Sequence, residues 1–225
     1  MDADDVAVPQ RLEIQVGEFR NPELAIVGGQ IDLLIGLTVC RAQPFPQAHA
    51  QIRRALLAGF PAFCHPTVMF RTALARRQRA YSIAGLGEDL DFFLRMTEAG
   101  EGCNLPAVLC RYRLHEESAS FTSFDEVRRN YSFALACANA RRNGLTEPDH
   151  AQYAELWTRR SWAARLATKT ECFAVQLYRK SRIRLTRGQR FQGLAGAAIS
   201  VALRPRLIQT RARIAIAALA RGETA

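Results

Sequence analysis

The sequence has no C-x-x-C pair, no closely spaced cysteine framework and no internal repeat. Its six cysteines are scattered, which favours neither a zinc site nor a disulfide-stapled secreted fold. The amino terminus is acidic and has no apolar region of the kind that signal peptides carry. The longest uncharged apolar stretch, Phe191 to Leu203, is shorter than the roughly 20 residues of a membrane-spanning helix. These absences favour a soluble, cytoplasmic protein with reduced thiols.

What the sequence does have is a large apolar fraction and an uneven charge. Its 225 residues are 48% hydrophobic, enough for a sizeable core in one domain with an appendage. The net charge is +10, but the residues from Arg159 onward hold 15 Lys and Arg against 2 Asp and Glu, whereas those before it hold 16 against 19. The basic character therefore belongs to the carboxy-terminal tail.

The hydrophobic pattern predicts alternating helices and strands, and hence an α/β fold. Gly28 and Gly29 separate two short apolar runs, which predicts two strands there. The expected elements are a short helix after Pro9, strands at Leu24 to Gly28 and Ile31 to Ile35, a helix from Gln47 to Ala58, a strand from Thr67 to Phe70, a helix from Glu88 to about Ala99, a strand from Val108 to His115, a helix from Phe124 to about Asn143 and a long helical stretch from Ala151 into the tail.

The chain opens with the acidic sequence "DADD". Two carboxylates one residue apart, extended at the end of a strand, project to the same side and supply the hard oxygen ligands that divalent cations prefer. Taken alone, the motif is more typical of a solvated terminus.

A second acidic motif, "GLGEDLDFFLRM", places Glu88 and Asp89 at the start of a predicted helix. The helix dipole stabilises a charged carboxylate there, which suits an oxygen that accepts a proton. A simple helix cap is the commoner role of such a pair.

The third motif, "NLPAVLCRYRLHEESAS", brings His115 onto one strand face with Arg111 and Arg113. Imidazole ligates metals and guanidinium groups match phosphate, so this face can meet a metal-bound diphosphate. Solvated surface residues would give the same pattern.

Together, "MDADDVAVPQRLEIQV", "GLGEDLDFFLRM" and "NLPAVLCRYRLHEESAS" resemble, in order, the metal motif, the E-D motif and the closing Y-R-x-H-x-x-S-x-S segment of family 2 glycosyltransferases with a GT-A fold. The segment "PAFCHPTVMFR" also resembles that family's strand before the E-D loop. The resemblance implies a partial, Rossmann-like mixed sheet with flanking helices over residues 1–122, followed by a helical, basic extension over residues 123–225.

The resemblance also implies roles for individual residues. Asp2 and Asp4, with His115, would hold Mn or Mg against the diphosphate of a nucleotide-sugar donor, which Arg111 and Arg113 would contact. Asp89 would be the base that activates an acceptor hydroxyl for a single displacement with inversion. Glu88 would position Asp89 or bind the acceptor, and His65 would lie on the acceptor side. The acceptor would be a saccharide or a lipid-linked precursor of an envelope polysaccharide.

In that family the nucleotide-binding strands precede the metal motif, and here no such residues come before Met1. We therefore expect an incomplete sheet, poor folding or inactivity of this chain alone, and further coding sequence upstream. The basic tail fits an anionic membrane surface at the inner face of the membrane, and equally a solvated or oligomerising helix. Two other hypotheses stay open, a nucleic-acid-binding protein that uses the tail and a non-catalytic remnant.

Overall fold

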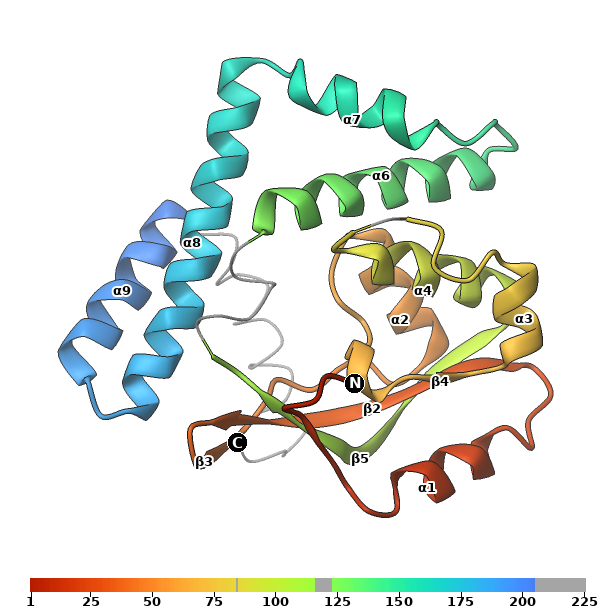
Figure 1. Cartoon of the computed structure of the whole chain (residues 1–225), viewed down its shortest axis with the longest axis horizontal. Helices are drawn as coiled ribbons and strands as arrows, with labels where there is room; N and C mark the ends of the chain where they lie inside the picture. The colour runs from red at the N-terminus through yellow and green to blue at the C-terminus, as the bar shows by residue number, and fades with distance from the viewer. Residues whose placement is uncertain (84, 116–122, 205–225) are drawn as a thin grey trace. The chain divides into compact units, whose positions relative to one another are not determined.

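The computed structural model describes residues 1–83, 85–115 and 123–204, and the chain forms two compact units, Met1–Arg159 and Arg160–Ala225. The first unit contains a mixed sheet with flanking helices, as the sequence predicts (Figure 1). Its elements are β1 (Val6–Ala7), α1 (Arg11–Glu18), β2 (Leu24–Ile35), β3 (Thr38–Arg41), α2 (His49–Leu57), η1 (His65–Thr67), β4 (Met69–Phe70), α3 (Thr72–Arg77), α4 (Glu88–Ala99), β5 (Glu101–Arg113), α6 (Phe124–Arg142) and α7 (His150–Thr158).

The sheet has five strands and is built around β2. Its order is β1-β5-β2-β3, with β4 also paired to β2. The β2 and β5 strands are parallel, whereas the other pairs are antiparallel. Helices α2 and α4 lie on one side of the sheet, and α6 packs against α4 (Figure 1).

The two strands predicted around Gly28 and Gly29 are one continuous strand, so the prediction of a break was wrong. A Cβ on Gly28 would overlap the side-chain amide of Asn104 on β5, and one on Gly29 would overlap the Leu109 side chain. The glycines therefore let β5 side chains approach the backbone of β2 closely, and the ladder shifts register beside Gly29 without ending.

Strand β5 is longer than the expected Val108 to His115, because it begins at Glu101 and ends at Arg113. Part of its backbone bonds to groups outside any strand. The N–H of Gly102 donates to His49 Nδ1 (3.0 Å), and the N–H of Asn104 donates to the carbonyl of Gln47 (3.2 Å). Gln47, just before α2, and His49, its first residue, thus accept hydrogen bonds from backbone N–H groups of β5.

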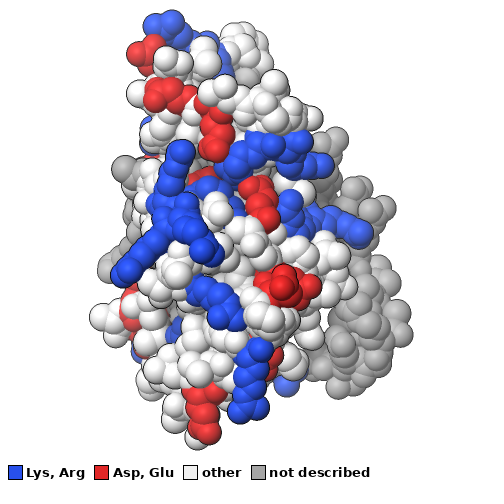
Figure 2. All heavy atoms as spheres, turned by 90° about the vertical axis from the view of Figure 1, so that its right-hand side faces the viewer, with Lys and Arg blue, Asp and Glu red and all other residues white. Residues whose placement is uncertain are grey.

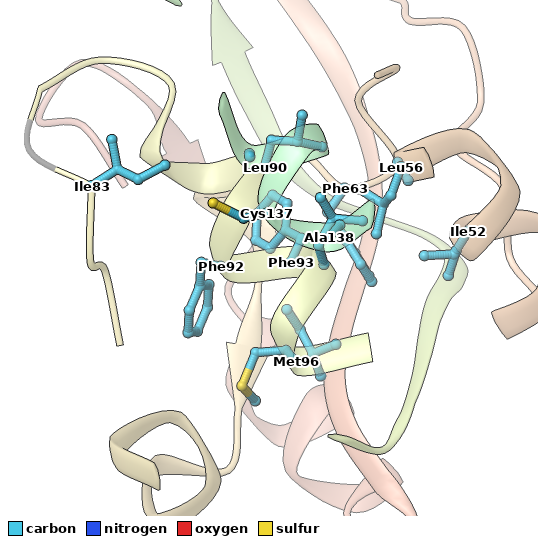
Figure 3. Packing of buried hydrophobic residues seen from close by; sticks show 14 of the residues in the cluster. Ile52, Leu56, Phe63, Ile83, Leu90, Phe92, Phe93, Met96, Cys137 and Ala138 are labelled. Carbon is cyan, nitrogen blue, oxygen red and sulfur yellow. The ribbon is translucent and has the colours of Figure 1, made fainter. Parts of the chain in front are cut away.

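The main core lies between the sheet and α2, α4 and α6. The middle of α4, from Leu90 to Thr97, is buried, and Phe92, Phe93 and Met96 are among its largest side chains. Figure 3 shows these side chains beside Leu56 of α2 and Cys137 of α6. Burial of this kind contributes about 1.5–3 kcal/mol for each large apolar side chain, which fixes α4 and its amino-terminal end against the sheet.

A buried ion pair also holds α4 to the loop before it. Asp91 and Arg95, one helical turn apart, form a 2.7 Å contact, and both side chains are almost fully buried. Arg95 also donates to the carbonyl of Ala80 (2.6 Å), and Ser82 donates to Asp91 (2.9 Å). The pair therefore fixes the loop that leads to the E-D motif.

The second unit contains α8 (Trp162–Thr186) and α9 (Arg190–Leu203). The expected long helical stretch from Ala151 is therefore interrupted, because Ser161 caps α8 and Gly188 adopts a left-handed conformation (φ 79°) before α9. The two compact units divide between Arg159 and Arg160, further along the chain than the functional boundary expected after residue 122. That functional boundary stays a prediction. Among the described helices, none combines the length and the apolar character that crossing a bilayer requires.

All six cysteines are free thiols. On the face shown in Figure 2, a group of basic side chains lies beside acidic ones. The part of the tail pattern that falls on residues 205–225 lies outside the described residues.

Candidate active site

The loop before α4 presents Glu88 and Asp89 at the first turn of the helix, as the sequence predicts. Gly87, directly before them, has a left-handed backbone (φ 88°), and a Cβ there would crowd the backbone of Val127 on α6. Glycine therefore permits both the turn and the close approach of α6 to the motif.

Helix α6 holds this loop through two partly buried polar contacts. The Asn130 side chain donates to the carbonyl of Leu86 (2.8 Å), and Glu126 accepts from the N–H of Leu86 (3.3 Å). Asn130 is fully buried, and its amide NH₂ is held by the bond to Leu86 while its Oδ1 lies 3.2 Å from Nε2 of His150. The position of the E-D loop thus depends on a helix about 40 residues further along the chain.

Asp89 lies in a partly buried polar environment. Its Oδ1 accepts from the N–H of Leu90 (2.9 Å), and its Oδ2 lies 3.4 Å from the hydroxyl of Tyr131. Burial raises the pKa of Asp89 above its ordinary value, the charge of His65 lowers it, and the charge of Glu88 raises it. A raised pKa makes this carboxylate a stronger base, which is what proton removal from a hydroxyl requires.

His65 lies near Asp89 because a short turn holds it there. Its Nε2 is 2.8 Å from the hydroxyl of Tyr81, and burial raises the pKa of that phenol to about 12. The turn is fixed through Thr67, whose hydroxyl donates to the carbonyl of Cys64 (2.8 Å) and whose carbonyl accepts from the side chain of Gln15 (2.7 Å). The E-D motif and this turn form one polar cluster.

The acidic opening lies at the carboxyl end of β5, where β1 pairs with Arg111 and Cys110. It forms a turn rather than the expected extended strand end, and the N–H of Asp5 donates to the carbonyl of Asp2 (3.3 Å). Oδ2 of Asp4 lies 3.3 Å from Nε2 of His115, and both side chains are about 40% exposed. The structure therefore brings Asp4 and His115 together across the sequence.

Asp5 and Arg113 fix this turn. Asp5 is buried and accepts the backbone N–H of Arg113 (2.9 Å), while its Oδ2 has no hydrogen-bond partner. Burial raises the pKa of Asp5 above its ordinary value. The Arg113 guanidinium donates to the carbonyl of Asp4 (2.9 Å), so it supports the turn, whereas Arg111 is exposed.

These residues fit a divalent ion in part. Asp4 and His115 supply one carboxylate oxygen and one imidazole nitrogen close enough to share an ion. Across residues 1–83, 85–115 and 123–204, no group of three or more His, Cys, Asp or Glu side chains is arranged to hold a metal, and Asp2 does not join the pair. The remaining ligands would come from water or from a bound phosphate. Residues 116–122 of the closing motif lie outside the described residues.

The buried thiol of Cys64 directly precedes His65 in the chain. Burial raises the pKa of its thiol well above the ordinary value, and the negative charges of Asp5 and Asp89 raise it further. Both carboxylates therefore act on one buried side chain next to His65.

Sequence reasoning missed Tyr81, Tyr131 and the positioning role of Asp5. No spacing in the sequence relates the two tyrosines to Asp89, because one lies in an irregular loop and the other on a helix after the motifs. Asp5 stood inside the quoted "DADD" motif, and its burial follows only from the pairing of β1 with β5.

Comparison with known proteins supports a glycosyltransferase relationship. The O-antigen biosynthesis glycosyltransferase WbnJ of Escherichia coli is 33% identical over 122 residues, which is 52% of this chain and 47% of that protein. EpsE of Bacillus subtilis, provisionally named a glycosyltransferase, is 29% identical over 139 residues, or 60% of this chain and 46% of that protein. The chain thus spans about half the length of these curated relatives. No protein-family profile matches it.

Proposed function

We propose that this chain is the metal- and acceptor-binding part of an inverting, metal-dependent family 2 glycosyltransferase. It would transfer a sugar from a nucleotide-sugar donor to a hydroxyl of a saccharide or lipid-linked acceptor. The observation that carries the proposal is the position of Asp89 at the start of α4, in one polar cluster with His65 and Tyr131. The name of the Escherichia coli relative supports a role in envelope polysaccharide synthesis.

In the proposed reaction, Asp89 takes the proton from the acceptor hydroxyl. The acceptor oxygen forms a bond to the anomeric carbon as the bond from that carbon to the diphosphate breaks, which inverts the configuration. Oδ2 of Asp89 is the better proton acceptor, because Oδ1 is engaged by the 2.9 Å bond from Leu90 whereas the Tyr131 contact is 3.4 Å long. Glu88 and His65 would contact the acceptor or orient Asp89 from either side.

Asp4 and His115 would hold Mn or Mg beside the donor diphosphate, with water or phosphate oxygens as the remaining ligands. A bound ion stabilises the negative charge that develops on the leaving nucleoside diphosphate. Arg111 would contact the phosphate oxygens, and Arg113 would do so while keeping Asp4 in place through its carbonyl.

The test is a screen of nucleotide sugars with the purified protein. We expect release of nucleoside diphosphate that depends on acceptor and on Mn or Mg. The Asp89→Asn variant should lower turnover by about 10²–10⁴-fold. Asp125→Asn, which changes an exposed acid in the first turn of α6, is the matched control and should keep full turnover.

Two outcomes would contradict the proposal. Undiminished turnover in Asp89→Asn would remove this residue from the role of base. Absence of turnover with every donor, in the folded protein, would favour the non-catalytic hypothesis.

A further inference from the structure

Helices α8 and α9 form a hairpin (Figure 1), in which small residues of α9 lie against α8. The face of α9 toward α8 consists of Gly193, Gly196 and Ser200, all buried. A Cβ on Gly196 would overlap the hydroxyl of Ser181, and Ser200 donates to the carbonyl of Ala174 (2.6 Å). Small residues let the two backbones approach closely, as they do between helices in lipid.

The large apolar side chains of α9 point away from α8. Phe191 is 87% exposed, Leu194 62% and Ile199 51%. Their spacing places them on one face, opposite the buried glycines. A helix in water normally buries its large apolar side chains and exposes polar ones, so α9 has the reverse distribution. Helix α8 adds Trp162 and Phe173, which are 72% and 54% exposed.

The charge of the same hairpin is strongly positive. Residues 160–204 hold ten Lys and Arg against one acidic residue, Glu171, which pairs with Arg204 at 2.7 Å. No charged residue occurs from Phe191 to Leu203. The hairpin therefore combines an uncharged apolar helix with cationic residues concentrated on α8 and on the ends of α9.

We propose that the α8–α9 hairpin binds the surface of an anionic lipid bilayer, with the Phe191 face of α9 lying at the boundary between headgroups and acyl chains. The 14 residues of α9 measure about 21 Å. This is shorter than the roughly 30 Å apolar core of a bilayer, so the helix lies in the plane of the interface. Basic residues around an apolar face match anionic headgroups, whereas nucleic acid would leave the apolar face in water. A second copy of this chain would bring two strongly positive hairpins together.

The experiment is flotation of the full chain with vesicles of phosphatidylcholine alone or mixed with phosphatidylglycerol. We expect the protein to float with the anionic vesicles and to be released by high salt. The double variant Phe191→Ser/Leu194→Ser should bind the anionic vesicles at least about tenfold more weakly. Leu145→Ser, at a 65% exposed position of the first unit, is the matched control and should bind normally.

Circular dichroism would establish that the double variant keeps its helices. If the double variant loses its helices, Phe191→Ala alone gives the same test, because the exposed side chain of Phe191 contributes little to folding. Unchanged binding of the folded variant would overturn the proposal, as would absence of flotation. Retention on duplex DNA without flotation would assign the hairpin to nucleic acid. Dimers that the double variant dissociates, again without flotation, would assign it to a second copy of the chain. None of these results depends on glycosyl transfer.

Discussion

The imidazole of His115 lies 3.3 Å from the carboxylate of Asp4, although one residue follows the last strand of the sheet and the other opens the chain. The contact exists because β1 pairs with the end of β5 and Arg113 binds the carbonyl of Asp4. A carboxylate and an imidazole held in this way can share a cation without further rearrangement.

We therefore expect Mn²⁺ to bind at this pair. Nuclear magnetic resonance should show the imidazole protons of His115 broadening at lower Mn²⁺ concentrations than those of His49, whose Nδ1 accepts the N–H of Gly102. Asp4→Asn should remove this preference by replacing a charged ligand with a neutral one. Equal broadening of the two histidines in the unchanged chain would contradict a metal role for the pair.

Stability should depend on pH through Asp89. Burial raises its pKa in the folded state, so folding favours the protonated carboxyl and this stabilisation is lost as the pH rises through the folded pKa. The Asp89→Asn variant should therefore resist urea better than the unchanged chain at pH 7. This difference in stability should disappear as the pH falls to the ordinary pKa of an aspartate.

Asp125→Asn serves as the control for this comparison. This exposed acid stands at the first turn of α6, where its charge favours the helix, so neutralising it should lower the free energy of unfolding by about 0.3–1 kcal/mol. Urea unfolding would measure the difference in free energy of unfolding between Asp89→Asn and the unchanged chain. If this difference is the same at pH 4 and pH 7, ionisation of Asp89 does not destabilise the fold.

The buried pair Asp91–Arg95 should be the most sensitive charged site of α4. Arg95→Leu leaves a buried carboxylate without its partner and should cost about 3–5 kcal/mol. The double variant Asp91→Leu/Arg95→Leu should recover much of that loss. Glu155→Gln, in the exposed pair Glu155–Arg159 with the same spacing, should cost at most about 0.5 kcal/mol. A double variant no more stable than Arg95→Leu in urea unfolding would refute this account.

Gly28 should tolerate no side chain. Gly28→Ala would push a Cβ into Asn104 and to 2.8 Å from Phe63, which should cost about 1–3 kcal/mol in urea unfolding. Gly17→Ala is the matched control, since nothing lies within 4 Å of a Cβ there, and it should raise stability by up to about 1 kcal/mol. Similar effects of the two changes would mean that β5 can move away from β2.

The sequence by itself determined the alternation of helices and strands, the start of α4 at Glu88 and the place of Asp89 in its first turn, because periodicity and helix-terminal residues act over a few neighbouring positions. It also located the excess positive charge in the tail, because the distribution of charge along the chain follows from the residue types alone.

Only the tertiary structure decided that Gly28 and Gly29 lie within one strand, that Asp4 meets His115 and that Tyr131 reaches Asp89. It also decided that α9 buries its glycines and exposes Phe191. Each of these results depends on contacts between residues distant in the chain, which packing selects and local sequence patterns do not record.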